Sequence, residues 1–134
     1  MGQKVHPTGF RLGISTEYTS KWYAGSRDYS SYLLEDYRIR EYLKKQLENA
    51  SVSKIVIERP TKEAVVNIYT SRPGIVIGKK GEDIEKFRNK IANILNTDRA
   101  TVKVNVKEIK KPELDAQLVA EGITQQLERR IMYR

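Results

Sequence analysis

Cysteine is absent from this chain of 134 residues, and histidine occurs only once, as His6. The missing thiols exclude disulfide bonds, a cysteine nucleophile and every cysteine-bearing zinc or iron–sulfur site. A single histidine also excludes a multi-histidine metal site and a histidine acid–base pair. No stretch approaches the ~20 apolar residues of a membrane-spanning helix, and the N-terminus lacks the apolar core of a signal peptide. We therefore expect a soluble protein that is not exported, has no membrane partner and needs no cofactor.

What the chain does have is positive charge. It carries 25 Lys and Arg against 17 Asp and Glu, a formal net charge of +8. A basic domain suits a polyanionic partner, because each phosphate that it neutralises releases counterions. Membrane phosphates are the competing polyanion, but the lack of a spanning segment and of a signal peptide favours nucleic acid. The length allows one domain with flanking segments.

Residues 1–30 are expected to form an extended arm rather than a helix. Glycine and proline interrupt the helical period there, at Gly2, Pro7, Gly9, Gly13 and Gly25. Aromatic residues stand beside the basic ones in this arm, at Phe10, Tyr18, Trp22 and Tyr23. Such residues either stack on bases or pack onto the body of the protein. Both readings stay open at this point.

The remaining chain has the pattern of an α+β domain. The expected elements are a helix at 31–49, strands at 52–59 and 63–70, a short helix before Gly78, a helix from Gly81 to Leu95, a strand at 101–107 and a helix from Pro112. The short link after Pro60 predicts a hairpin between the first two strands. We expect a three-stranded sheet with helices on one face at residues 31–110, and a final helical segment at 111–134. The tyrosines of the first helix (Tyr32, Tyr37, Tyr42) are expected in the core or at its boundary.

The informative motif is Gly78-Lys79-Lys80-Gly81, which follows the apolar triplet Ile75–Ile77. Glycines lack Cβ atoms, so Gly78 and Gly81 permit a tight turn and a close approach of a nucleic-acid backbone. The helix after Gly81 directs its free N–H groups at the turn, where they favour an anion. Lys79 and Lys80 add two positive charges. This combination predicts a loop that holds phosphates, whereas the plainer interpretation is a helix–turn–helix corner with solvated lysines.

The same loop excludes two other phosphate-binding motifs. A Walker A loop needs Lys and then Ser or Thr after its last glycine, but Glu82 and Asp83 follow Gly81. A dinucleotide fingerprint needs a third glycine where Ile84 stands. The two carboxylates either hold a magnesium ion or, more simply, stabilise the helix dipole. We find no catalytic constellation and expect that the chain is not an enzyme.

The pattern I-V-I-G-K-K-G-x-x-I within an αββααβ order resembles the type II KH domain, whose loop clamps single-stranded RNA. Several further blocks resemble the family of the third protein of the bacterial small ribosomal subunit. They are MGQKVHP at 1–7, SKIVIERP at 53–60, RPGIVIGKKGED at 72–83, KPELD at 111–115 and QLERR at 126–130.

This resemblance implies a cytoplasmic protein of the small-subunit head that binds small-subunit ribosomal RNA. It also implies contacts with the tenth and fourteenth small-subunit proteins. In the complete protein it implies help in positioning messenger RNA at the channel where it enters. Family members continue into a second domain, so we expect a fragment whose messenger contact is weakened, with Arg134 as the first of that channel's basic residues. The alternative is a freestanding KH-domain RNA regulator.

The remaining candidate RNA contacts are basic residues outside the loop. By resemblance, Lys4, His6 and Arg11 reach ribosomal RNA, unless the terminus is merely solvated. Arg72 contacts a phosphate or forms a surface salt bridge. Arg129 and Arg130 contact RNA or complement the end of the last helix. The outward lysines of the strand at 101–107 (Lys103, Lys107) face RNA or solvent.

Overall fold

The computed structural model describes residues 2–61 and 63–130. The helices are α1 (Pro7–Arg11), α2 (Tyr29–Gln46), α3 (Pro73–Ile77), α4 (Glu82–Leu95) and α5 (Ala116–Glu128). The strands are β1 (Ser20–Lys21), β2 (Val52–Glu58), β3 (Ala64–Thr70) and β4 (Val102–Glu108). From α2 to β4 the order is the predicted αββααβ, so the α+β fold of a type II KH domain is confirmed.

The sheet is mixed, with the strand order β1-β2-β3-β4. β2 and β3 form the predicted antiparallel hairpin, and β4 returns parallel to β3 after the crossover through α3 and α4. The expectation of three strands was wrong by one. Ser20 and Lys21 of the arm pair in parallel with Ile57 and Glu58, and this adds a short fourth strand.

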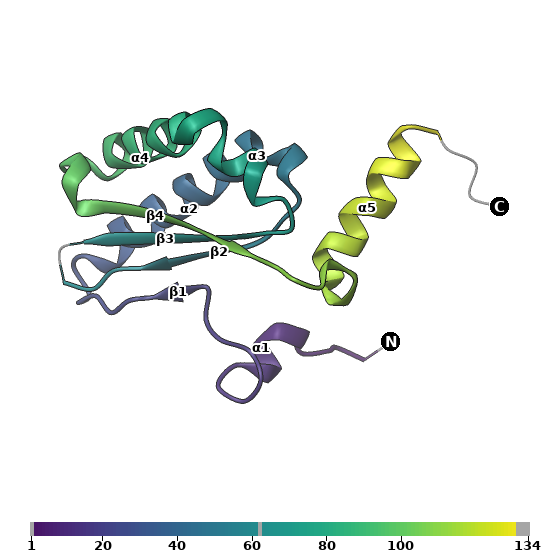
Figure 1. Ribbon diagram of the computed structural model, residues 1–134. Helices are drawn as coiled ribbons and strands as arrows, with labels where there is room; N and C mark the ends of the chain where they lie inside the picture. The colour runs from purple at the N-terminus through teal and green to yellow at the C-terminus, as the bar shows by residue number, and fades with distance from the viewer. Residues whose placement is uncertain (1, 62, 131–134) are drawn as a thin grey trace.

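One face of the sheet carries the core. Alternate residues of β3 point to the same side, and Ala64, Val66 and Ile68 are all buried there as predicted. α2, α3 and α4 cover this side, and in Figure 1 they lie above the sheet while the arm with α1 lies below it. The helices contribute their apolar residues to the same cluster, among them Ile39, Leu43, Val76, Phe87 and Ile91. This burial is the main stabilising term of the fold.

The arm is not wholly extended, which corrects the prediction for residues 1–30. Pro7 stands in the first turn of α1, where a missing N–H costs nothing. The Nδ1 of His6 accepts a hydrogen bond from the Gly9 N–H at 3.4 Å and caps this short helix. Arg11 closes it by donating to the Pro7 carbonyl at 2.9 Å. His6 and Arg11 therefore take part in the local structure of the arm.

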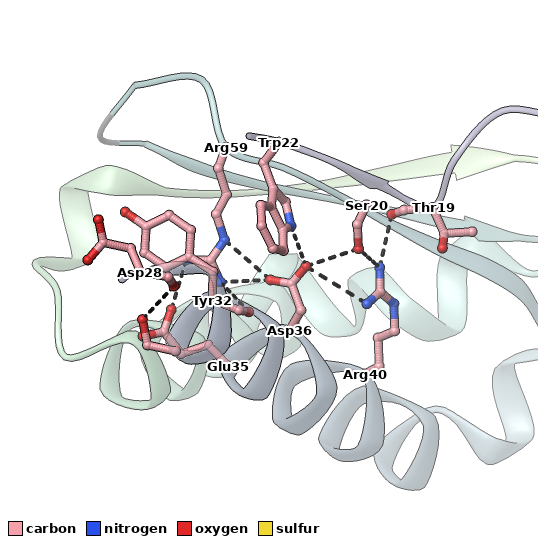
Figure 2. Close-up of polar contacts among 10 residues, drawn as sticks. Thr19, Ser20, Trp22, Asp28, Tyr32, Glu35, Asp36, Arg40 and Arg59 are labelled. Atoms are coloured by element: carbon pink, nitrogen blue, oxygen red, sulfur yellow. Dashed lines mark hydrogen bonds and ion pairs between the residues drawn. The ribbon is translucent and has the colours of Figure 1, made fainter. Parts of the chain in front are cut away.

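Asp36 on α2 fastens the arm to the body (Figure 2). Its side chain is fully buried and accepts hydrogen bonds from Ser20 Oγ at 3.1 Å and Trp22 Nε1 at 2.7 Å. From the other side Arg59, just after β2, donates to it at 2.7 Å, and Arg40 approaches to 3.8 Å. A buried charge is tolerated only with such partners. One carboxylate therefore joins arm, helix and sheet.

Arg59 is also held by a second carboxylate and by aromatic rings. It pairs with Glu35 at 2.8 Å, and its guanidinium lies 4.5 Å from the centroid of Tyr32. Burial alone would lower the pKa of Arg59, but the hydrogen bonds to Asp36 and Glu35 outweigh it and raise the pKa. Trp22 packs edge-on against Tyr32 at 5.7 Å between centroids. For Trp22, packing onto the body is therefore the correct reading, whereas Tyr23 is 93% exposed.

The last helix begins later than predicted. Pro112–Leu114 form a separate 3₁₀ turn, and α5 starts at Ala116 because Asp115 is its N-cap. The Asp115 carboxylate accepts from the N–H groups of Gln117 and Leu118 at 3.0 and 3.3 Å. In Figure 1, α5 extends away from the sheet and the other helices. Most of its surface is exposed, and Leu118 is its one buried residue.

Candidate nucleic-acid interface

The Gly78–Gly81 loop joins α3 to α4 and has an unusual backbone. Gly78 (φ 71°, ψ −173°) and Gly81 (φ 82°) both adopt positive φ, which a side chain disfavours. Between them Lys80 also takes a left-handed conformation (φ 54°). This tight turn presents the side chains of Lys79 and Lys80 to solvent. Among the residues the structure describes, neither lysine has an ion-pair partner.

Gly78 is needed for a second reason. A Cβ placed there would lie 2.1 Å from Oδ2 of Asp83 in the first turn of α4. Asp83 is itself held by Lys86, whose Nζ is 2.9 Å from Oδ1. The absence of a side chain at Gly78 therefore lets the loop fold back over α4.

A shallow hollow of about 490 Å³ opens beside this loop. Ile75 of α3 is 50% exposed on its rim, which gives the hollow an apolar border next to the charged loop. Bases pack on apolar side chains while lysines meet the backbone, so this combination suits a single strand of nucleic acid. The lining residues are Gly74, Ile75, Gly78, Lys79, Glu82, Asp83 and Lys86.

The start of α4 both attracts and repels anions. Its N-cap is Gly81, and no side chain in the described ranges caps the free N–H groups that follow, so these remain available to a phosphate. However, the first turn contains Glu82, Asp83 and Glu85. Residues 79–86 thus hold three lysines and three carboxylates. Because the net charge of this segment is zero, net charge alone does not favour an anion here. Attraction of a phosphate depends on the positions of the free N–H groups and on how far the side chains of Lys79 and Lys80 extend.

The other predicted contacts are dispersed over the molecule. Arg72 lies at the N-cap of α3, exposed near the loop, and it forms no salt bridge within residues 2–61 and 63–130. Lys4 is exposed on the arm with His6 and Arg11. Arg129 and Arg130 follow α5, which Figure 1 shows apart from α3 and α4. Arg134 lies outside the described residues.

Two features of the interface are new relative to the sequence prediction. Lys86, one turn into α4, lines the hollow. It forms an ion pair with Asp83, the residue whose side chain lies against Gly78. Its position three residues after Asp83 is the signal that sequence reasoning could have used. On β4, Lys103 pairs with Glu63 at 2.6 Å, whereas Lys107 contacts Tyr69.

The part of the chain that the structure describes contains no cluster of three or more His, Cys, Asp or Glu suited to a metal ion. Each of its helices is too short or too polar to cross a membrane.

A lysine-bearing two-glycine loop between two helices, above a sheet of this topology, defines a class of single-strand nucleic-acid binders. The chain belongs to the KH domain family, whose model matches residues 38–114, more than half of its length.

The relatives are more specific. The whole chain is 57% identical to small ribosomal subunit protein uS3 of Paracidovorax citrulli (strain AAC00-1) and covers 45% of that protein. It is 58% identical to uS3 of Pseudoalteromonas translucida (strain TAC 125) and covers 56% of it. The resemblance to the third small-subunit protein is thereby confirmed. The chain spans about half the length of the curated relatives it matches.

Proposed function

We propose that this chain binds small-subunit ribosomal RNA as a structural constituent of the small ribosomal subunit. The observation that carries the proposal is the Gly78–Gly81 loop, where two glycines with positive φ bring Lys79 and Lys80 to the start of α4. Among the described residues, neither lysine has an ion-pair partner and no side chain caps this helix. A phosphodiester backbone fits this arrangement, and the exposed Ile75 provides a surface for the bases. The relatives' names favour ribosomal RNA over other single strands.

The division of labour along the chain is part of this proposal. Residues 31–110 form the RNA-binding body, residues 1–30 an arm with Lys4, His6 and Arg11 as further RNA contacts, and residues 111–134, which include α5, the segment leading to a second domain. In that larger protein, Arg134 is the first of the basic residues that help to position messenger RNA where it enters, and Arg129 and Arg130 are further RNA contacts. The head proteins numbered ten and fourteen are the neighbours. The chain carries out this function in the cytoplasm, as part of the small ribosomal subunit.

The loop is tested by reversing its charge. Lys79→Asp together with Lys80→Asp should abolish binding of a labelled single-stranded RNA, measured by fluorescence anisotropy at moderate salt. The variant should stay folded by circular dichroism, since both side chains are exposed. The neutral pair Lys79→Gln with Lys80→Gln should weaken binding without abolishing it. If each lysine neutralises one phosphate, the slope of log K against log salt concentration should become shallower by about 1.4.

A matched control changes the same charge elsewhere. Lys45→Asp with Lys90→Asp alters two exposed lysines on α2 and α4 and should reduce affinity far less. Equal losses in the two double variants would mean that only net charge matters, and would refute the loop as the binding element.

The ribosomal assignment has a separate test. A tagged copy of the chain should sediment with small subunits on a sucrose gradient and stay there after a high-salt wash, which strips weak electrostatic passengers. Release to the top fractions would favour the freestanding RNA regulator instead.

A further inference from the structure

The face of the sheet opposite the helices has its own pattern of side chains. Residues that alternate with the buried core positions point to this face, and β-pairing aligns them in three rungs across β2, β3 and β4. The rungs are Lys54–Tyr69–Lys107, Val56–Asn67–Asn105 and Glu58–Val65–Lys103. The middle rung is linked by a 3.1 Å hydrogen bond from Asn105 to Asn67.

The first of these, the lysine–tyrosine rung (Lys54, Tyr69 and Lys107), gathers cations around one aromatic ring. Lys54 Nζ lies 4.8 Å from the centroid of Tyr69, and Lys107 Nζ lies 5.3 Å from it and 3.3 Å from the phenol oxygen. Both lysines are exposed. Within the described ranges neither has a carboxylate partner, whereas Lys103 on the same face pairs with Glu63 at 2.6 Å.

The arm borders this rung without neutralising it. The charges of the rung act on Glu17 of the arm: the pKa of Glu17 is lowered first by its hydrogen bond with Lys21, and further by the charges of Lys54 and Lys107. The Glu17 carboxylate is already engaged by Lys21 at 2.5 Å. Neither lysine of the rung is therefore ion-paired with a carboxylate of the described residues, and both are accessible to an outside anion.

The chemistry of this rung matches a nucleic-acid strand. Neighbouring strands are about 4.8 Å apart, so the two lysines start from backbones about 10 Å apart and lean towards the ring between them. The ammonium groups of Lys54 and Lys107 can each meet a phosphate, and the tyrosine ring between them can contact a base. An acidic peptide would use the ammonium groups alone and leave the ring without a role.

We propose that the lysine–tyrosine rung is a second contact for single-stranded RNA. It rests on the proposed function, because the same strand that the Gly78–Gly81 loop holds would continue to this face. Tyr69 lies at the end of β3, the exposed Arg72 follows three residues later where α3 begins, and the Gly78–Gly81 loop follows α3. RNA thus passes from the loop, over Arg72, to the opposite side of the sheet.

RNA length separates the two contacts experimentally. An RNA of about 5 nucleotides satisfies the loop, which clamps about four, whereas one of about 20 nucleotides also reaches the rung. The variant is Lys54→Gln with Lys107→Gln, which neutralises the rung at exposed positions. Its affinity for the short RNA should stay within about twofold of the wild type. For the long RNA, the slope of log K against log salt concentration should become shallower by about 1.4.

The control Lys45→Gln with Lys90→Gln removes the same charge at two exposed positions on α2 and α4 and should keep the wild-type preference for the long RNA. Wild-type affinity and slope of the rung variant on the long RNA would overturn the proposal and leave the loop intact. Conversely, loss of long-RNA binding in the rung variant together with full binding by the Lys79→Asp, Lys80→Asp variant would support the rung and refute the loop. If a polyglutamate peptide binds the wild type but not the rung variant, while the RNA affinities of the two agree, the face docks an acidic protein and the proposal fails.

Discussion

Ser53 donates a 2.5 Å hydrogen bond to the carboxylate of Asp115, across 62 residues of chain. Ser53 stands at an irregularity in β2, where the pairing shifts between Val52 and Lys54, and such bulges re-aim a side chain. Asp115 uses its other oxygen to cap α5. One carboxylate thus both starts the helix and ties its first turn to the sheet, which sets the direction in which α5 leaves the body.

We expect Asp115→Ala to loosen α5 locally. The loss of the cap costs about 1 kcal/mol, and the bond from Ser53 is lost with it. Because α5 buries only Leu118, the global unfolding midpoint should move little. Hydrogen exchange by NMR should show faster exchange of α5 amides, while those of β2–β4 are unchanged. Ser53→Ala is the matched control, because it keeps the cap. Equal exchange in both variants would show that the cap contributes nothing.

This capping residue marks a limit of sequence reasoning. Pro112 and the acidic residues after it predicted a helix from that point, since proline favours the first helical turn. The structure instead uses Pro112 to start a separate 3₁₀ turn, and an N-cap carboxylate at Asp115 starts the helix. Both assignments are compatible with the local sequence. Asp115 also accepts the bond from Ser53, which no local pattern connects to this segment.

Asp36→Ala should destabilise the whole domain. Its carboxylate is fully buried with Trp22 and Arg59 as donors, so its removal leaves a buried guanidinium without its nearest partner. The expected loss in the free energy of unfolding is about 3–5 kcal/mol, measured by urea titration. Glu17→Gln breaks the exposed pair with Lys21 and should cost less than about 1 kcal/mol. A loss of that small size for Asp36→Ala would contradict the role of the network.

Arg59→Lys should be far from conservative. Arg59 contacts Glu35 and Asp36 with different guanidinium nitrogens and lies over the ring of Tyr32. A lysine provides one compact charge and cannot reproduce this fork. We expect a loss of about 1.5–3 kcal/mol by the same titration, from hydrogen bonds to charged groups. Lys54→Arg, at an exposed position, is the neutral comparison. A stability of Arg59→Lys equal to wild type would mean that the fork is dispensable.

The burial of Asp36 explains what the sequence could and could not predict. The core positions of β3 and α4 follow simple periods, so Val66, Ile68 and Ile91 were predictable and are fully buried. Asp36 looks like a residue of the polar helix face, and its partners come from segments before and after α2. The prediction that Tyr37 lies in the core or at its boundary was wrong: its side chain is 64% exposed, because the neighbouring Asp36 occupies the inward position.

The candidate interface was partly predictable for a similar reason. Two glycines at a spacing of three, Gly78 and Gly81, require a special backbone, and both take positive φ. The exposure of Lys79 and Lys80 follows from their place in the turn. The contact between Gly78 and Asp83 and the alignment of Lys54 with Tyr69 and Lys107 depend on packing and on strand register. Neither the contact nor the alignment can be predicted from a local sequence pattern.

The contact between Gly78 and Asp83 gives the last prediction. Gly78→Ala should destabilise the protein by about 1–3 kcal/mol, because its backbone conformation is nearly restricted to glycine. The new methyl group also collides with the Asp83 side chain. Gly74→Ala, in α3 with open space around its Cβ position, should instead stabilise by about 0.5–1 kcal/mol.

A double-mutant cycle by urea titration separates the two causes of that loss. Asp83→Ala in the Gly78→Ala background removes most of the colliding side chain but leaves the backbone cost. It should therefore recover part of the lost stability, with a coupling energy of at least about 0.5 kcal/mol between the two sites. Additive effects of the two substitutions would show that Asp83 yields freely, and that Gly78 is required for its backbone alone.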